Sequence, residues 1–325
     1  MRSIAVTGVS GYLGRLLLWR LDDDPSVEQV VGLDVKEPPA RCARKLVFYR
    51  QDINEPMGPL FERHRVEAAV HLVYVLRPVR DRRWATQINV EGTRNFLAAC
   101  HHAKVGRILY PSSTSVYGAW PDNPVPLTEA HPPRPKRGFQ YSYEKRETED
   151  LCREYAREHP EATVVIARGA PGLGPDATNW IGRTLVGGAG LQIWGYDPPL
   201  QFVHDDDFAA ALHTLLAAAV PGTFNVGGEG TVPYSAVARE ANRLRMAVPA
   251  PVLYSAAGLS WRLRLQSASP PEGLDYIRYP WIASSEKLKR ETGFAFRYTS
   301  LEALRAYVAA WKAARERRAA SPSDA

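Results

Sequence analysis

The segment TGVSGYLG, residues 7–14, constrains the fold more than any other part of the chain. It follows an apolar run at residues 3–6 and opens an amphipathic helical stretch. Gly8, Gly11 and Gly14 permit a tight turn, a close backbone approach to a ligand, and close packing of a helix on a strand. Because the N-terminus of a helix attracts negative charge, the pattern predicts that a dinucleotide places its pyrophosphate at this turn.

Asp34 ends the next predicted strand, 20 residues after Gly14. A carboxylate at this place can accept hydrogen bonds from ribose hydroxyls and repels a 2′-phosphate, so the sequence favours NAD over NADP. An ordinary strand–helix turn is the first alternative. A hydrolase nucleophile at Ser10 is the second, but that elbow needs the pattern G-x-S-x-G, and residue 12 is Tyr.

Short β-branched runs alternate with longer helical stretches through the first half of the chain. The runs that predict strands are residues 3–6, 29–33, 45–49, 68–75, 107–110 and 163–167, and the stretches that predict helices are residues 12–21, 84–103 and 143–159. This alternation predicts an α/β fold with a Rossmann-type, doubly wound parallel sheet.

The rhythm of strand and helix weakens after Arg168, where Gly, Pro and Trp become frequent. We therefore expect residues 1–167 to form an NAD-binding Rossmann domain, with residues 202–228 returning to its sheet. Residues 168–325 are expected to form mostly a smaller, mixed substrate-binding lobe. A basic tail from about residue 312 is predicted to be a solvated helix end.

Composition excludes several classes of partner. The formal charge of +6 suits an anionic ligand, but no aromatic-plus-basic pattern predicts a nucleic acid partner. No apolar run approaches the ~20 residues of a membrane span, so no membrane partner is expected. Cys42, Cys100 and Cys152 are isolated, which predicts no metal site and a reducing compartment. The first residues run straight into a strand, so a cytoplasmic location is expected.

A hydroxyl-rich segment, SSTS at residues 112–115, ends the predicted strand at residues 107–110 and faces the crevice where parallel sheets bind ligands. Further on, Tyr141 and Lys145 are four residues apart and share a helix face, while Tyr143 points the other way. Each pattern alone is common in polar loops and on helix surfaces.

Taken in order, these patterns resemble the extended short-chain dehydrogenase/reductase family, in particular its nucleotide-sugar epimerase and dehydratase group. The matching segments are TGVSGYLG (7–14), Asp34, Asp52-Ile53, HLVYV (71–75), NVEGTRNFL (89–97), SSTSVYG (112–118), YSYEK (141–145), FVHDDDFAAA (202–211), FNVGG (224–228) and SSEKLKRETGF (284–294).

The resemblance implies catalytic roles for Ser113, Tyr141 and Lys145. Tyr141 would take or return the proton of a substrate hydroxyl while hydride moves to or from NAD. Lys145 would hold the nicotinamide ribose and lower the pKa of the phenol, and Ser113 would hydrogen-bond the reacting oxygen. We expect the side chain of Tyr143 to serve in packing or to lie on the helix surface.

The resemblance also implies the residues that contact the cofactor. They are Gly8, Ser10, Gly11, Tyr12, Leu13, Gly14, Asp34, Asp52, Ile53, Leu72, Val73, Asn89, Tyr141, Lys145 and Arg168. Asn89 has the alternative of an ordinary polar residue at a helix start. The resemblance also implies that the chain forms a homodimer.

Two further segments could be mistaken for a metal site or a phosphate-binding loop, but a simpler structural interpretation is favoured for each. His204 and the three aspartates that follow it, residues 205–207, are contiguous, so their side chains fan apart and favour a helix N-terminus over a metal site. The segment GAPGLGP, residues 169–175, shows no following helix that would bind phosphate and is expected to be a loop that lines the substrate crevice.

Three departures from the family bear on the substrate. Thr114 and Ser115 replace the acidic pair of the dehydratases, which disfavours sugar dehydration. Pro171 stands where the sugar-nucleotide enzymes carry an asparagine, and Leu200 where they carry a phosphate-binding arginine. We expect that such an arginine, if the chain has one, comes from the set Arg183, Arg262 and Arg278.

The leading hypothesis is an NAD-dependent enzyme that oxidises a secondary carbinol carbon, as an epimerase of a nucleotide sugar. A dehydrogenase or ketoreductase acting on a less polar alcohol or ketone is the alternative within the same class. A non-catalytic protein that senses NAD is the alternative from another class, because a fold alone assigns no activity.

Overall fold

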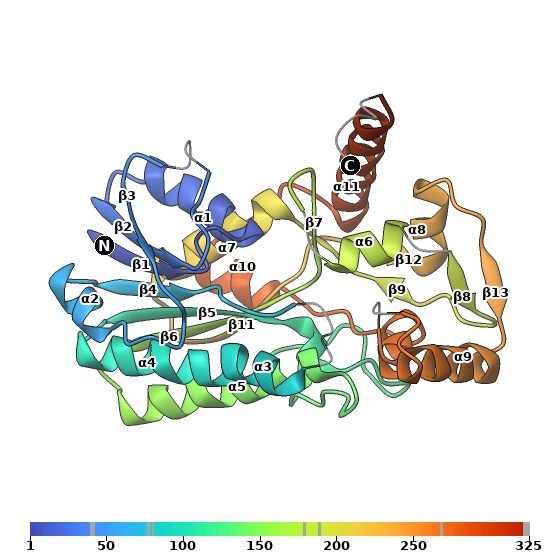
Figure 1. Cartoon of the computed structure of the whole chain (residues 1–325), viewed down its shortest axis with the longest axis horizontal. Helices are drawn as coiled ribbons and strands as arrows, with labels where there is room; N and C mark the ends of the chain where they lie inside the picture. The colour runs from blue at the N-terminus through green and yellow to red at the C-terminus, as the bar shows by residue number, and fades with distance from the viewer. Residues whose placement is uncertain are drawn as a thin grey trace.

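The structure is a computed structural model that describes residues 1–39, 43–76, 79, 81–177, 180–187, 190–266 and 269–320. A parallel sheet lies between two layers of helices, and a group of shorter elements lies beyond the ends of its strands (Figure 1). The predicted α/β fold is confirmed.

Seven strands form the central sheet in the order β11-β6-β5-β4-β1-β2-β3, and every pairing is parallel. Their bounds are β1 Ser3–Thr7, β2 Gln29–Asp34, β3 Leu46–Arg50, β4 Ala68–His71, β5 Arg107–Ser113, β6 Thr163–Gly169 and β11 Gly222–Val226. Strands β2 and β3 lie on one side of β1, and β4 and all later strands of this sheet lie on its other side. The order of the strands therefore reverses between β1 and β4. Ligands bind at the carboxyl ends of strands beside such a reversal.

Helices cover both faces of the sheet (Figure 1). One face carries α1 Tyr12–Asp23, α7 Asp205–Ala218 and α10 Glu286–Thr292, and the other carries α2 Gly58–Arg63, α3 Arg82–Thr86, α4 Gly92–His102 and α5 Gln140–Glu158. Each layer has its own core of buried apolar side chains. Leu17, Leu212 and Phe224 belong to the first core, and Phe61, Phe96 and Tyr110 belong to the second.

One predicted helix is interrupted. The predicted stretch, residues 84–103, is helical up to His102, one residue short of its predicted end, but a π-helical segment, η1 Gln87–Glu91, separates α3 from α4. Such bulges are frequent at functional sites. The helix expected from residue 143 begins three residues earlier, at Gln140, so Tyr141 lies in its first turn.

The remaining elements lie beyond the carboxyl ends of the sheet strands (Figure 1). They are η2 Thr114–Tyr117, β7 Gly172–Leu173, α6 Trp180–Gly187, β8 Leu191–Ile193, β9 Pro199–Leu200, β10 Val203–His204, β12 Val232–Pro233, α8 Tyr234–Glu240, β13 Met246–Val248, α9 Ala250–Arg262, η3 Pro271–Ile277 and α11 Ser300–Ala320. Three two-stranded sheets pair β10 with β7, β12 with β9 and β13 with β8.

The segment at residues 169–175 differs from its prediction. It contains the short strand β7, which pairs with β10, and a helix, α6, does follow it five residues later. Neither β7 nor the helix after it was predictable from the sequence, because β7 is only two residues long and Gly and Pro surround it. Of the helices described, none combines the length and the apolar character that crossing a bilayer demands.

Candidate functional site

The glycine turn between β1 and α1 has the geometry that its sequence predicts. Gly8 has φ +73°, and a Cβ added to it would lie 2.9 Å from the backbone of Leu72 and Val73, which follow β4. A Cβ at Gly14 would lie 2.3 Å from the carbonyl oxygen of Gly8. Gly11 is the N-cap of α1 and has no side chain to cap it. The N–H groups of the first turn of α1 are therefore available to an anion.

Asp34 lies beside this turn at the end of β2. Its Oδ2 accepts a hydrogen bond from the backbone N–H of Ser10 at 3.1 Å, and its Oδ1 accepts one from the N–H of Lys36 at 3.0 Å. These bonds fix the carboxylate while leaving lone pairs on both oxygens, because each can accept more than one bond. A glycine turn with a fixed carboxylate one strand away fits a dinucleotide.

Other residues predicted at the cofactor surround the turn. The Ser10 hydroxyl donates to the Lys36 carbonyl at 2.5 Å, and half-buried Leu13 packs against the first core. The Tyr12 side chain packs against the core of the C-terminal elements that contains Leu173. Its hydroxyl is buried and has no hydrogen-bond partner among the described residues. Burial raises the pKa of Tyr12, with Asp205 adding to the effect.

Asp52 and Ile53 lie at the next position along the sheet edge, after β3. The Asp52 carboxylate accepts hydrogen bonds from the backbone and side-chain nitrogens of Asn54, at 2.9 and 2.8 Å. The Ile53 side chain is buried, and a Cβ added to Gly92 would come within 2.9 Å of it. The side chain of Ile53 thus packs beneath α4.

Ser113 and Tyr141 come together at the carboxyl end of β5. Ser113 is the last residue of that strand, and its side chain lies close enough to the phenol of Tyr141 to affect its pKa. The Ser113 Oγ accepts a hydrogen bond from the backbone N–H of Ser115 at 3.2 Å. Burial raises the pKa of Tyr141 to about 12, although the nearby Ser113 side chain opposes that rise. The phenol is therefore a proton donor at neutral pH.

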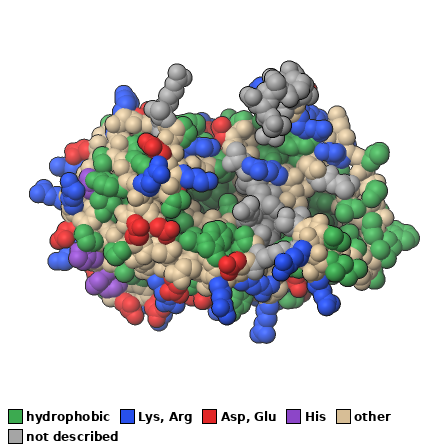
Figure 2. Space-filling model, in the orientation of Figure 1, with side chains coloured by type: hydrophobic (Ala, Val, Ile, Leu, Met, Phe, Trp, Pro, Cys, Tyr) green, Lys and Arg blue, Asp and Glu red, His purple; other side chains and the backbone are tan. Residues whose placement is uncertain are grey.

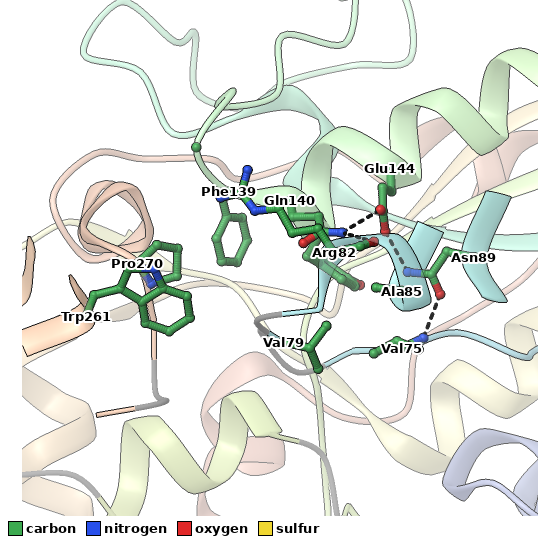
Figure 3. A pocket seen from close by; sticks show the side chains of 12 residues that line it. Val75, Val79, Arg82, Ala85, Asn89, Phe139, Gln140, Glu144, Trp261 and Pro270 are labelled. Atoms are coloured by element: carbon green, nitrogen blue, oxygen red, sulfur yellow. Dashed lines mark hydrogen bonds between the residues drawn. The ribbon is translucent and has the colours of Figure 1, made fainter. Parts of the chain in front are cut away.

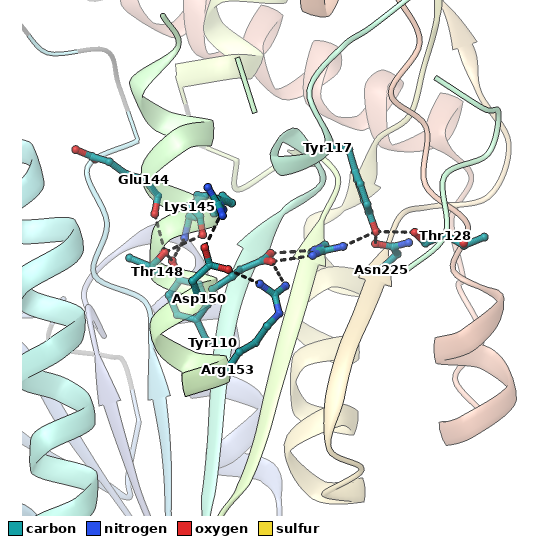
Figure 4. Close-up of polar contacts among 12 residues, drawn as sticks. Tyr110, Tyr117, Thr128, Glu144, Lys145, Thr148, Asp150, Arg153 and Asn225 are labelled. Carbon is teal, nitrogen blue, oxygen red and sulfur yellow. Dashed lines mark hydrogen bonds and ion pairs between the residues drawn. The ribbon is translucent and has the colours of Figure 1, made fainter. Parts of the chain in front are cut away.

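Lys145 lies one turn further along α5, buried beneath the same strand. Its Nζ donates to the Tyr110 hydroxyl at 3.1 Å (Figure 4). It also donates to the Pro111 carbonyl at 2.8 Å, and it lies 3.7 Å from the centre of the Tyr74 ring. Burial lowers the pKa of Lys145 to about 7, while the charge of Glu149 acts in the opposite direction.

The effect of Lys145 on the pKa of Tyr141 stays a prediction. The pKa of the phenol is raised because the phenol is buried. The ammonium of Lys145 is held by Tyr110 and Pro111 on the strand side of α5.

Tyr74 joins this group, although the sequence prediction did not include it. Its ring meets Tyr141 edge-on, with 5.6 Å between ring centres, and its hydroxyl donates to the Tyr141 carbonyl at 3.3 Å. The same ring covers the ammonium of Lys145, which is a cation–π arrangement. The only sequence signal is its place in the segment HLVYV, directly after β4.

Asn89 lies in η1 and connects the loop after β4 to α5. Its Oδ1 accepts a hydrogen bond from the Val75 N–H at 2.8 Å, and its Nδ2 donates to the Glu144 carboxylate at 2.7 Å (Figure 3). Glu144 is buried and also accepts hydrogen bonds from Thr86 and Gln140, each at 2.7 Å. Asn89 therefore orients the two segments that carry Tyr74 and Tyr141.

A small pocket of about 30 Å³ opens beside Tyr141 (Figure 3). The residues that line it are Val75, Val79, Arg82, Ala85, Asn89, Gly138, Phe139, Gln140, Tyr141, Glu144, Trp261 and Pro270. Its walls come from the loop after β4, the start of α5 and helix α9. Seven of these twelve lining residues have apolar or aromatic side chains.

Arg168 does not have the surroundings expected of a cofactor ligand. Its side chain is buried, and the guanidinium forms a bidentate pair with Glu149, with N–O distances of 2.9 and 2.8 Å. A further N–H donates to the Tyr117 hydroxyl at 2.7 Å, and Tyr117 in turn donates to Asn225 (Figure 4). Although burial raises the pKa of Glu149, Arg168 holds that pKa below its usual value. The structure gives Arg168 the role of joining β6 to α5.

Comparison with known proteins decides the family. The model of the NAD dependent epimerase/dehydratase family matches residues 4–227, which is more than half of the chain. The chain belongs to this family. It is an NAD-dependent enzyme of the extended short-chain dehydrogenase/reductase type.

Individual proteins are similar to this chain in sequence or in structure. An uncharacterized protein of Mycobacterium tuberculosis is 28% identical over 311 residues, which cover 94% of this chain and 82% of the relative. The UDP-glucose 4-epimerase of Erwinia amylovora is 29% identical over 178 residues, 51% of this chain and 52% of that one. The structure of the Thermus thermophilus UDP-glucose 4-epimerase with NAD has a TM-score of 0.73 at 21% identity, covering 96% of this chain and 99% of that one.

The positions where this family member departs from its relatives are now placed in space. The Leu200 side chain is apolar and buried in the core beneath α11, so it makes no bond to a diphosphate. Arg183 and Arg262 are exposed. Arg278 is half-buried among Tyr196, Tyr254 and Tyr279, and it donates to the Tyr196 hydroxyl at 3.0 Å.

The acidic run after β10 serves the protein's own backbone. His204 caps α7 by accepting a hydrogen bond from the Asp206 N–H at 3.2 Å. Asp205 accepts from the Asp176 N–H, and Asp207 accepts from the N–H groups of Arg297 and Tyr298. Within the described residues, no group of three His, Cys, Asp or Glu side chains is arranged to hold a metal ion.

Proposed function

We propose that this enzyme moves hydride at a secondary carbinol carbon and that Ser113, Tyr141 and Lys145 carry its proton chemistry. The observation that supports the proposal is that Ser113, at the carboxyl end of β5, and Tyr141, in the first turn of α5, lie close together. That end of the sheet also carries the glycine turn and the Asp34 carboxylate. The two groups that exchange a proton with a substrate therefore lie on the ligand-binding edge of the fold.

When bound, NAD supplies the hydride acceptor and, once reduced, the hydride donor. Tyr141 takes the proton of the substrate hydroxyl during oxidation and returns it to the carbonyl oxygen during reduction. Ser113 holds the same oxygen through its hydroxyl and steadies the charge that develops there. Because burial keeps the phenol protonated, proton donation to a carbonyl is the easier direction.

The substrate that we propose first is a nucleotide sugar, which the enzyme would epimerise. The relative from Erwinia amylovora is a UDP-glucose 4-epimerase, and a similar structure from Thermotoga maritima, 20% identical with a TM-score of 0.73, was determined with UDP-glucose. Thr114 and Ser115 are both buried beside Ser113 and neither is acidic, so loss of a sugar hydroxyl as water lacks a local acid.

A less polar alcohol or ketone is the second candidate, and one observation favours it. The pocket beside Tyr141 is walled by Val75, Val79, Phe139, Trp261 and Pro270 (Figure 3). Pockets with apolar walls and a few convergent polar groups suit largely apolar ligands. Under this candidate, residues 168–325 would supply an apolar lobe over the reacting carbon.

Two measurements separate these candidates. An epimerase recycles its cofactor, so the purified protein should release close to one NAD per chain when it is denatured, and it should interconvert UDP-glucose and UDP-galactose without added NAD. A dehydrogenase should lose its NAD on gel filtration and should reduce added NAD in the presence of hydrophobic secondary alcohols. Failure of both UDP-sugars and alcohols to react in the wild type, with NAD bound, would contradict the proposal.

A further inference from the structure

Helix α9 has an unusual distribution of apolar residues between its two faces. The face toward the protein carries Leu253, which is buried, Tyr254, whose hydroxyl donates to Asp275 at 2.5 Å, and Trp261, which lines the pocket beside Tyr141. Residues on that face are expected to be apolar. The solvent side, however, is apolar as well.

The outward face of α9 carries Val252, Ala256, Leu259 and Leu263, which recur at helical spacing and therefore form one stripe. The side chains of Val252, Leu259 and Leu263 are 57%, 59% and 58% exposed. A solvent-facing helix surface normally carries charged residues. The only charged residue of α9 is Arg262, which flanks the stripe near its C-terminal end.

The chain segment that carries this stripe is basic and contains no acid. Residues 241–271 include four arginines and neither Asp nor Glu. Arg245, Arg262 and Arg264 are exposed, and none of them forms an ion pair with any residue that the structure describes. We refer to Val252, Ala256, Leu259, Leu263, Arg262 and Arg264 as the α9 surface.

Further exposed apolar side chains adjoin the α9 surface. Strand β13 leads directly into α9, and Leu244 and Met246 beside it are exposed. Trp194, which is 70% exposed, bonds through its backbone N–H to the carbonyl of Val248 at the end of β13. Hydrophobic side chains gather at this end of the molecule, at the right of Figure 2. Apolar surface of this extent marks an interaction site.

We propose that the α9 surface binds an anionic lipid surface. An amphipathic helix that lies in a membrane interface combines an apolar stripe with flanking arginines, and tryptophan is enriched at that depth. Unpaired arginines are attracted by anionic headgroups. A second copy of the chain fits poorly, because two α9 surfaces would bring arginine against arginine with no acid between them.

This proposal revises the expectation that the chain has no membrane partner. That expectation came from the absence of a spanning segment, but a helix that lies in the interface needs no span. The proposal is independent of the catalytic assignment, because it concerns binding only.

Flotation of the purified chain with lipid vesicles tests the proposal. We expect the wild type to float with vesicles of phosphatidylcholine that contain about a third phosphatidylglycerol, and to bind pure phosphatidylcholine far more weakly. Raising the salt concentration should weaken the binding. Arg262→Gln with Arg264→Gln should weaken it by about 30-fold, since each arginine near an anionic surface contributes about a fivefold factor. Leu259→Ser with Leu263→Ser should abolish flotation.

Matched controls distinguish the α9 surface from general stickiness or charge. Trp19→Ser removes an exposed apolar side chain from α1, and Arg50→Gln with Arg94→Gln lowers the net charge equally at exposed sites elsewhere. Both controls should bind vesicles like the wild type. The proposal is overturned if the wild type does not float, if the controls lose binding as the α9 variants do, or if Leu259→Ser with Leu263→Ser instead dissociates an oligomer.

Discussion

The phenol of Tyr141 lies beside the side chain of Ser113, and burial of that phenol raises its pKa to about 12. Tyr141→Phe removes the proton while keeping the ring. We expect turnover to fall by about 10³-fold, which lies within the range for loss of a general acid, and NAD affinity to stay nearly unchanged. Steady-state kinetics and NAD titration check both parts. Tyr143→Phe, at an exposed position on the same helix, should behave like the wild type.

Lys145 makes the stability of the protein depend on pH. Burial lowers its pKa to about 7 from the ordinary 10.5. Between these values the unfolded chain binds more protons than the folded chain, so the free energy of unfolding gains a contribution that rises with pH across that window. Lys145→Met lacks this contribution. We expect the variant to be more stable than the wild type near pH 6, with an advantage that shrinks toward pH 10.

Urea unfolding of the cofactor-free protein at several pH values measures this difference. Lys36→Met, at an exposed lysine, should follow the wild type at every pH. A constant difference between wild type and Lys145→Met from pH 6 to pH 10 would show that Lys145 titrates normally in the folded chain.

We expect Asp34 to set the preference for NAD. Its carboxylate is held by the N–H groups of Ser10 and Lys36 and is free to accept from ribose hydroxyls. Asp34→Asn should weaken NAD binding by about tenfold or more, as expected for a lost hydrogen bond to a charged group. It should weaken NADP binding less, because the repulsion of the 2′-phosphate is lost at the same time. Titration of both cofactors checks this, with Asp23→Asn at the exposed end of α1 as control.

The sequence predicts those parts of the fold that depend on local pattern. The glycine turn, the buried strands and the position of Asp34 after β2 follow from residue type and spacing, because a parallel strand must be apolar and a left-handed φ at Gly8 requires glycine. The same reasoning finds α5, since Tyr141 and Lys145 share one face of it.

Roles that depend on tertiary partners are not predictable in this way. Arg168 and Glu149 lie on different elements, and only packing of β6 against α5 shows that they pair. Tyr74 occupies an unremarkable position after β4, and its contact with Lys145 depends on the path of the following loop. The pKa of Lys145 is set by burial that no spacing rule contains.

The buried pair of Arg168 and Glu149 provides a test of a structural role for Arg168. Arg168→Met leaves the buried Glu149 with the half-buried Arg153 as its remaining ion-pair partner among the described residues. Breaking a buried pair costs about 3–5 kcal/mol, so the melting temperature should fall markedly. The double variant Arg168→Met with Glu149→Leu should recover part of that loss, because no charge is left uncompensated.

NAD titration of Arg168→Met, well below its melting temperature, separates this role from cofactor binding. We expect the affinity to remain within about threefold of the wild type, because the guanidinium is bound to Glu149 and Tyr117. A large loss of NAD affinity in a folded variant would restore the role that the family resemblance implies.

Tyr74 offers a test of the contact between its ring and Lys145. The ring centre lies 3.7 Å from the ammonium and favours its charged form. Tyr74→Phe keeps the ring and loses only the bond to the Tyr141 carbonyl, so kcat/KM should change by less than about threefold. Tyr74→Leu loses the cation–π contact, which should lower kcat/KM by about tenfold. It should also move the alkaline loss of activity, expected near the Lys145 pKa of about 7, to lower pH. Profiles of kcat/KM against pH measure both effects, and equal impairment of the Phe and Leu variants would refute the role of the ring.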